Sequence, residues 1–129
     1  MRVNKAGKPA TVVRDDEGQW RQLSVPGVFL KVLRSEKYTG ESTVLLRFGA
    51  GIGFPAHNHP GGEEVYVLDG DIKLGRHDLK TGDYLYTPPN RKHAAKSKHG
   101  CLILVRVPKP IEIVKGVSTF AKRLGAAHG

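Results

Sequence analysis

Residues 51–70 decide the fold, and they read Gly51-Ile-Gly-Phe-Pro-Ala-His57-Asn-His59-Pro-Gly-Gly-Glu63-Glu64-Val-Tyr-Val-Leu-Asp-Gly70. Alternate side chains of an extended chain point to the same face. His57 and His59 therefore share a face, and Glu63 keeps the same parity. Glu64 falls on the opposite face, so Glu63 is the better candidate to join the two histidines.

These side chains have the chemistry of metal ligands. Imidazole nitrogens combined with one carboxylate suit zinc, iron, manganese, nickel or copper. A pair of solvated loop histidines is the alternative for His57 and His59, but the in-phase Glu63 and the flanking glycines argue against it. Because three ligands from one short stretch rarely close a site, we expect a further ligand from elsewhere in the chain.

A second stretch supplies that ligand. Residues 82–93 read Gly82-Asp-Tyr-Leu-Tyr-Thr-Pro88-Pro-Asn90-Arg-Lys-His93. A glycine turn, a short apolar strand and a Pro-Pro-Asn turn lead to His93. The other histidines, His77, His99 and His128, have no such pattern around them and are expected at the surface.

The two stretches resemble the two motifs of the cupin (RmlC-like) superfamily. The first fits G-x5-H-x-H-x3-E-x6-G without a gap, at Gly51, His57, His59, Glu63 and Gly70. The second resembles G-x5-P-x-G-x2-H-x3-N through Gly82, Pro88 and His93. Asn90 stands where a glycine is usual, and asparagine also tolerates a left-handed turn. Ser97 replaces the final Asn.

Within the cupins, the chain is most similar to ChrR-type anti-sigma factors and acetylacetone-cleaving dioxygenases, over residues 20–108. The phrases His-Asn-His-Pro-Gly-Gly-Glu-Glu, Val-Leu-Asp-Gly-Asp, Thr-Pro-Pro-Asn-Arg-Lys-His and His-Gly-Cys-Leu-Ile-Leu-Val carry this similarity. It implies an all-β protein with the cupin double-stranded β-helix, a jelly-roll barrel, in a single domain. It also implies a divalent transition metal (Fe, Zn, Mn or Ni) held by His57, His59, Glu63 and His93.

The resemblance favours a metal-dependent, dioxygenase-like oxidoreductase that acts on a small oxygen-bearing organic molecule. Three imidazoles and one carboxylate leave positions of an octahedral ion open, as a catalytic site requires. Acetylacetone-cleaving dioxygenases hold their iron with three histidines and no glutamate, so the diketone reaction itself is not implied.

The alternative is a non-catalytic zinc-binding sensor or regulatory module like the ChrR cupin domain. Glu63 suits that function, whereas the chain has neither the length nor the ligands for the separate zinc-bearing, sigma-binding domain of those factors. An isomerase or lyase is a third, weaker option.

Length and composition fit one soluble domain of 129 residues, with 39% hydrophobic and 26% charged residues. No apolar run approaches the ~20 residues of a membrane span, and the N-terminus lacks the apolar core of a signal peptide. We therefore expect a cytoplasmic protein with no membrane association.

The single cysteine, Cys101, excludes an intramolecular disulfide and a cysteine-based zinc finger. Its apolar surroundings predict a buried structural thiol.

The formal net charge of +9 raises the question of nucleic acid binding. The Lys and Arg residues are scattered, with concentrations at residues 2–8, 91–98 and 122–123, and no aromatic residues interleave with them. Solvated faces and basic tails explain this pattern better than a nucleic acid partner. The basic residues near His93 are placed to flank a metal pocket and attract an anionic ligand.

Alternation and turn signals predict a series of short strands. The predicted strands are residues 19–25, 28–34, 42–50, 63–68, 72–76, 84–87, 93–96 and 101–107, with a hairpin turn at 69–71 and a turn at 77–80. We expect an N-terminal arm at 1–17, the cupin barrel at 18–110, and a C-terminal strand or tail at 111–129. Residues 118–124 are expected to form a short helix.

The sequence leaves several orientations open. Arg47 lies either on an exposed face or inside the barrel, and Phe54 either fills the core or walls the metal pocket. Tyr66, Tyr84 and Tyr86 can donate hydrogen bonds to a substrate if they face inward. Cupins of this type usually pair through their sheets, so the resemblance implies a homodimer that takes a small-molecule ligand or substrate.

Overall fold

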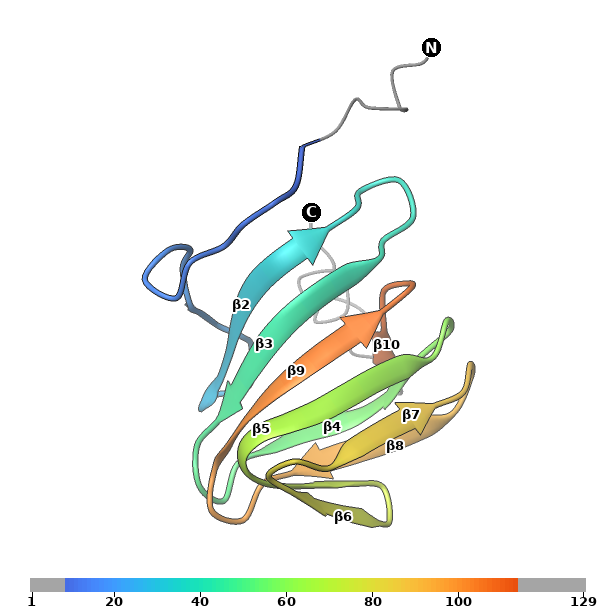
Figure 1. Ribbon diagram of the computed structural model, residues 1–129. Coiled ribbons are helices and arrows are strands. Elements are labelled where there is room, and N and C mark those ends of the chain that lie inside the picture. The colour runs from blue at the N-terminus through green and yellow to red at the C-terminus, as the bar shows by residue number, and fades with distance from the viewer. Residues whose placement is uncertain (1–8, 114–129) are drawn as a thin grey trace.

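The computed structural model describes residues 9–113, and within them the chain forms ten strands and no helix. The strands are β1 (Arg21–Gln22), β2 (Val28–Ser35), β3 (Ser42–Phe48), β4 (Gly53–Asn58), β5 (Glu63–Leu74), β6 (His77–Lys80), β7 (Tyr84–Thr87), β8 (Lys92–Lys96), β9 (Cys101–Val107) and β10 (Glu112–Ile113). They follow the order β1-β2-β3-β9-β5-β8-β4-β10, with β6 and β7 attached to β5. All pairs are antiparallel. The sheet curls into two layers (Figure 1), which confirms the predicted all-β jelly roll.

Strand β5 belongs to both layers. Residues 63–70 pair with β7 and β9, whereas residues 71–74 pair with β6 and β8. At the crossing, Gly70 has a φ of 86°, and a Cβ atom there would lie 2.1 Å from the carbonyl oxygen of Gly100. Only glycine fits such a position. The chain bends here without reversing, so the hairpin turn predicted at residues 69–71 is wrong.

The reversal comes at Gly75 and Arg76, after which His77 pairs with Leu74. The turn predicted at residues 77–80 is therefore wrong, because these residues form β6.

Several other element bounds differ from the prediction. The first strand is limited to β1, and β4 was not among the predicted strands. Strands β7 and β9 are confirmed as predicted, and β2, β3 and β8 differ by one or two residues at an end. Strand β10 forms in the C-terminal segment and pairs with β4. The helix predicted at residues 118–124 lies outside the described residues.

The core lies between the two layers, and β3 shows how the sequence fills it. Val44 and Phe48 are buried, whereas Arg47 is exposed and its guanidinium lies 4.7 Å from the ring centroid of Trp20. Arg47 therefore faces outward and makes a cation–π contact there.

Cys101 is buried in the core, as predicted. Burial raises the pKa of its thiol to about 11, so the thiolate that would make it reactive is disfavoured. Among the residues described, we find no helix with the length and apolar character needed to span a membrane.

Candidate metal centre

Three strands bring the predicted ligand residues to one place. His57 lies near the end of β4, and His59 follows that strand directly. His93 lies on the neighbouring β8, where its Cα is paired with that of His57. Glu63 is the first residue of β5. A register irregularity between Phe54 and His57 adjusts the end of β4, and such bulges re-aim side chains.

The turn that precedes β8 is attached to the backbone of His59. Asn90 has a φ of 62°, which confirms the left-handed conformation expected at this position. Its backbone N–H donates to the carbonyl oxygen of His59 at 2.7 Å, and the N–H of Gly62 donates to the same oxygen at 3.0 Å. These bonds fix the backbone of His59 relative to both β5 and β8.

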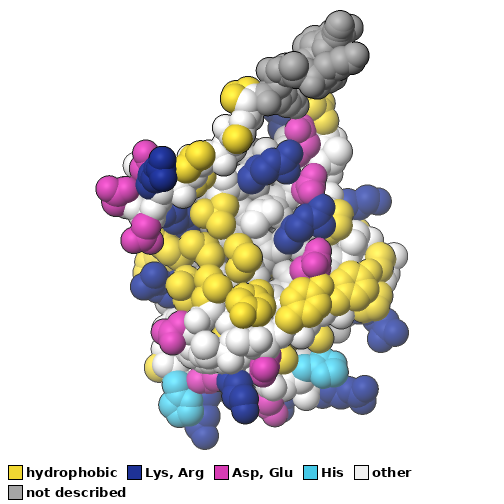
Figure 2. All heavy atoms as spheres, viewed as in Figure 1, with side chains coloured by type: hydrophobic (Ala, Val, Ile, Leu, Met, Phe, Trp, Pro, Cys, Tyr) yellow, Lys and Arg dark blue, Asp and Glu magenta, His cyan; other side chains and the backbone are white. Residues whose placement is uncertain are grey.

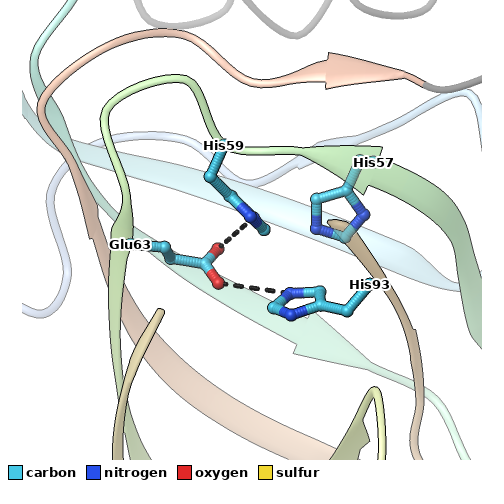
Figure 3. A group of neighbouring side chains, drawn as sticks. All are labelled: His57, His59, Glu63 and His93. Carbon is cyan, nitrogen blue, oxygen red and sulfur yellow. Dashed lines mark ion pairs between the residues drawn. The ribbon is translucent and has the colours of Figure 1, made fainter. Parts of the chain in front are cut away.

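The four side chains converge, with one potential ligand atom from each lying within 4.8 Å of the others. Glu63 bridges two of them, because its Oε2 lies 3.2 Å from His59 Nε2 and its Oε1 lies 3.4 Å from His93 Nε2 (Figure 3). His57, His59 and Glu63 are buried, and the His93 side chain is only 8% exposed.

In two of the histidines, a backbone carbonyl determines which ring nitrogen carries the proton and which keeps its lone pair. His57 Nδ1 lies 2.8 Å from the carbonyl oxygen of Pro55, and His59 Nδ1 lies 3.3 Å from that of Arg91. A carbonyl oxygen only accepts, so both Nδ1 atoms carry the proton and donate it. The Nε2 atoms then keep their lone pairs, which is the arrangement that second-shell partners impose on metal-ligating histidines.

The protonation state of His57 also matches that of a metal ligand. Burial lowers the pKa of His57 to about 4, so its ring is neutral near pH 7. His57 therefore presents a neutral imidazole to the cluster.

Three buried atoms of this cluster lack a hydrogen-bond partner: His59 Nε2, Glu63 Oε1 and His93 Nε2. The two ion-pair contacts of Glu63 are close in distance but do not satisfy hydrogen-bond geometry. An unsatisfied buried polar group costs about 1–3 kcal/mol, and native proteins rarely leave several together. A divalent cation would satisfy all of these lone pairs, so the donor set fits a metal ion.

The competing candidates lie elsewhere. Glu64 faces away from the cluster, accepts a 2.8 Å hydrogen bond from the Tyr84 hydroxyl and lies 3.6 Å from Arg106. His77 and His99 are exposed, as predicted. His128 lies outside the described residues.

The cluster borders an apolar cavity inside the barrel, to which His57 and Glu63 contribute. Phe54 lines this cavity and belongs to the core, and its ring meets that of His57 edge-on at 5.1 Å. Both interpretations of Phe54 therefore hold. The three tyrosines proposed as substrate contacts are exposed and do not line the cavity: Tyr66, Tyr84 and Tyr86.

The sequence did not indicate a polar clamp of Ser97, Asp71 and Gly100, which lies just beyond the layer crossing of β5. Ser97 is fully buried; its hydroxyl donates to the carbonyl oxygen of Asp71 at 2.6 Å and accepts from the N–H of Gly100 at 2.8 Å. The only sequence signal was the departure of Ser97 from the cupin motif. The carbonyls of Pro55 and Arg91 that orient the histidines leave no side-chain signal at all.

Comparison with known proteins places these features in a family. The sequence model of the ChrR cupin-like domain family matches residues 8–109 of this chain. The DNA damage-repair/toleration protein DRT102 of Arabidopsis thaliana is 35% identical over 78 aligned positions, and the match covers 56% of this chain and 24% of that protein. The chain thus spans about a quarter of the length of this curated relative.

Solved structures share the fold. An acetylacetone dioxygenase from Acinetobacter johnsonii superposes with a TM-score of 0.72 at 14% identity, covering 95% of this chain and 93% of that chain. The anti-sigma ChrR complexed with SigE of Rhodobacter sphaeroides superposes with a TM-score of 0.63 at 24% identity, covering 73% of this chain and 50% of that chain. At these identities the likeness concerns the fold alone.

Proposed function

This chain belongs to the ChrR cupin-like domain family, and we propose that it is a metal-dependent, dioxygenase-like enzyme. In this proposal His57, His59, Glu63 and His93 bind a divalent transition metal. The substrate is a small oxygen-bearing organic molecule, and dioxygen is the oxidant whose two atoms both enter the products. The observation that carries the proposal is that this unsatisfied donor set borders an internal cavity, whereas a structural metal site is closed by its protein ligands.

The protein's own groups would bind, orient and exclude water. Glu63 supplies the one negative charge, which would lower the net charge of a bound divalent ion to about +1. The carbonyls of Pro55 and Arg91 hold two imidazoles in the tautomer that binds. A bound metal would supply Lewis acidity and, if redox-active, a centre for oxygen chemistry. Apolar residues such as Phe54 line the cavity and would exclude water from it, which would strengthen electrostatic interactions inside it.

A zinc-binding sensor or regulatory module is the second candidate. The specific observation in its favour is the family model itself, which describes the ChrR cupin-like domain. Zinc fits the same donor set, because imidazole and carboxylate are both common zinc ligands. In this function the metal would hold the fold or an interface, and no turnover would occur.

Metal analysis of the full chain, purified without added metal and without a His-tag, tests both functions. We expect about one equivalent of metal in the wild type, lost in His59→Ala and retained in the control His99→Ala, whose histidine is exposed. Iron with substrate-dependent oxygen uptake would support the enzyme, whereas zinc without turnover would support the sensor. No metal in the wild type, even after reconstitution, would refute both.

We also propose a homodimer that forms through the outer face of β5 and β7. Hydrophobic side chains gather on this face (Figure 2), where Tyr66, Leu68, Tyr84 and Tyr86 are 40–55% exposed. Tyr66 and Tyr84 are cross-strand partners, so the patch is contiguous. Exposed apolar patches of this kind mark interaction sites.

Sedimentation at micromolar concentration tests this proposal. We expect a dimeric wild type, a monomeric Tyr86→Glu and a dimeric Tyr38→Glu, because Tyr38 is 89% exposed but lies outside β5 and β7. A monomeric wild type would refute the dimer.

We propose residues 18–110 as the barrel domain, with β10 adding a short strand beyond it.

A further inference from the structure

The barrel interior contains a cavity with an almost wholly apolar wall. Buried aliphatic side chains from several strands form it, including Leu30 of β2, Val44 of β3 and Val105 of β9. Among the described residues that line it, only His57 and Glu63 are polar. The proposed metal site therefore supplies the one polar part of an otherwise hydrocarbon wall.

The size of the cavity limits what it can hold. It offers about 50 Å³ to the centres of water-sized groups. One water needs ~10–15 Å³ on this measure, so the space holds roughly three to five such groups. An aliphatic wall gives water few hydrogen-bonding partners, and dry cavities of this kind bind small apolar molecules.

In the metal-free protein, the charge distribution excludes anionic ligands from the interior. None of the described lining residues is Lys or Arg, and Glu63 is itself a carboxylate. Burying a second, unpaired carboxylate there would cost several kcal/mol. The basic residues near His93, such as Arg91, Lys92 and Lys96, are exposed and do not line the cavity.

The lining also shows where a ligand would enter. Leu23 follows β1 and Ile111 precedes β10, and these two strands end the strand order. Within residues 9–113 no ladder joins β1 to β10, so the curled sheet has an open seam. Both side chains line the cavity, which therefore extends to this seam.

We infer that the cavity binds a small, uncharged molecule whose apolar part has roughly three to five non-hydrogen atoms. It enters between Leu23 and Ile111 and places its oxygen toward His57 and Glu63. The position of the oxygen rests on the proposed function. The size, apolar character and neutrality of the ligand rest on the cavity wall alone. Butanone represents this class, butyrate is its charged counterpart, and camphor is a bulky ketone outside the size limit.

Methyl NMR of the full chain, metal-free and zinc-loaded, tests the inference directly. We expect butanone to shift the methyl signals of interior residues such as Val44 and Val105 in a saturable way, in both forms. Camphor should leave these signals unchanged in both forms because it is too large. Butyrate should leave them unchanged in the metal-free form, where no cation offsets its charge.

Two variants on the same strand separate cavity binding from surface binding. Ala95 is buried and lines the cavity, whereas its neighbour Ala94 is exposed. We expect Ala95→Leu to weaken butanone binding at least about tenfold, because its side chain occupies the space, and Ala94→Leu to bind as the wild type does. If Ala95→Leu fails to fold, Val105→Ile adds one methylene to the wall and should weaken binding several-fold.

The outcomes separate this inference from the proposed function. Absent interior shifts with butanone, equal binding by the cavity-filling variant, or equal binding of butyrate by the metal-free protein would each overturn the inference. A protein that shows the interior shifts but binds no metal would uphold the inference and refute the enzyme. A protein that binds metal and turns over substrate but shows no interior shifts would refute the inference and support the enzyme.

Discussion

Strand β5 carries two carboxylates that each lie beside a histidine, one on each side of its layer crossing, and the two groups differ in whether their polar atoms are satisfied. At the N-terminal end, Glu63 lies 3.2 Å from His59 Nε2 and 3.4 Å from His93 Nε2, and three atoms of this group lack hydrogen bonds. Beyond the layer crossing, Asp71 accepts hydrogen bonds from His99 through its ring at 2.9 Å and its backbone N–H at 3.1 Å.

This difference separates a ligand site from a structural clamp. The residue types are alike, so composition alone does not distinguish them. A satisfied polar cluster already has its partners and holds the chain in place. A buried cluster with several unsatisfied polar atoms lowers the stability of the folded protein, and a bound ion would remove that cost by pairing with those atoms. Substitutions at the clamp should therefore change stability without metal, and those at the Glu63 cluster should change the response to metal.

The largest effect is expected at the layer crossing itself. Gly70→Ala should lower the free energy of unfolding by about 4 kcal/mol or more, because the new Cβ would clash with the carbonyl of Gly100 at a positive φ. Gly82→Ala is the control, since Gly82 has a φ of 91° but open space around it. It should cost only about 1–2 kcal/mol. Equal losses in urea unfolding would show that the crossing tolerates a side chain.

The second effect concerns metal affinity. Glu63→Gln keeps the shape of the side chain but removes its charge, so we expect zinc or iron affinity to fall at least about 100-fold, the upper end of what losing an outer-shell partner costs. Glu64→Gln, on the opposite face, should bind metal as the wild type does. Competition with a chromophoric chelator measures both. Unchanged affinity in Glu63→Gln would remove the carboxylate from the ligand set.

The third effect tests the clamp without metal. Ser97→Ala leaves the carbonyl of Asp71 and the N–H of Gly100 without their partner, and we expect a loss of about 2 kcal/mol in unfolding free energy. Ser35→Ala, at the exposed end of β2, should change stability by less than about 0.5 kcal/mol. The metal affinity of Ser97→Ala should equal that of the wild type. A loss of metal binding would mean that the two sides of the layer crossing in β5 are coupled.

The sequence predicted the candidate ligands better than the path of the chain between them. His57, His59 and Glu63 lie close together along the chain, so parity and spacing were enough to group them. Asp69-Gly70-Asp71 was predicted as a hairpin because a turn and a crossing both need glycine at positive φ. What decides between them is the contact of Gly70 with Gly100, which lies 30 positions away in the sequence.

The clamp and the cavity were beyond sequence reasoning for the same reason. The bond between Ser97 and Asp71 joins β5 to the loop before β9, and nothing local to either residue indicates it. The outward orientation of the tyrosines depends on the register of β5 against β7. Local alternation predicts which residues share a face, but the register and the curl of the sheet decide which face is inside.

The smallest effect is the pH dependence of stability that comes from the Asp71 carboxylate. Burial pushes the pKa of Asp71 upward, but hydrogen bonds from the backbone of Lys98 and from His99 outweigh it and lower the pKa below its ordinary value of 3.8. A carboxyl whose pKa is lower in the folded state adds stability above its unfolded pKa and loses it as pH falls through the folded one. The free energy of unfolding, measured with urea between about pH 2 and 6, should therefore fall less steeply toward acid in Asp71→Asn than in the wild type. Asp78→Asn, at an exposed position on β6, should follow the wild-type curve. If Asp71→Asn also followed it, the carboxylate would hold the loop through contacts that do not depend on its charge.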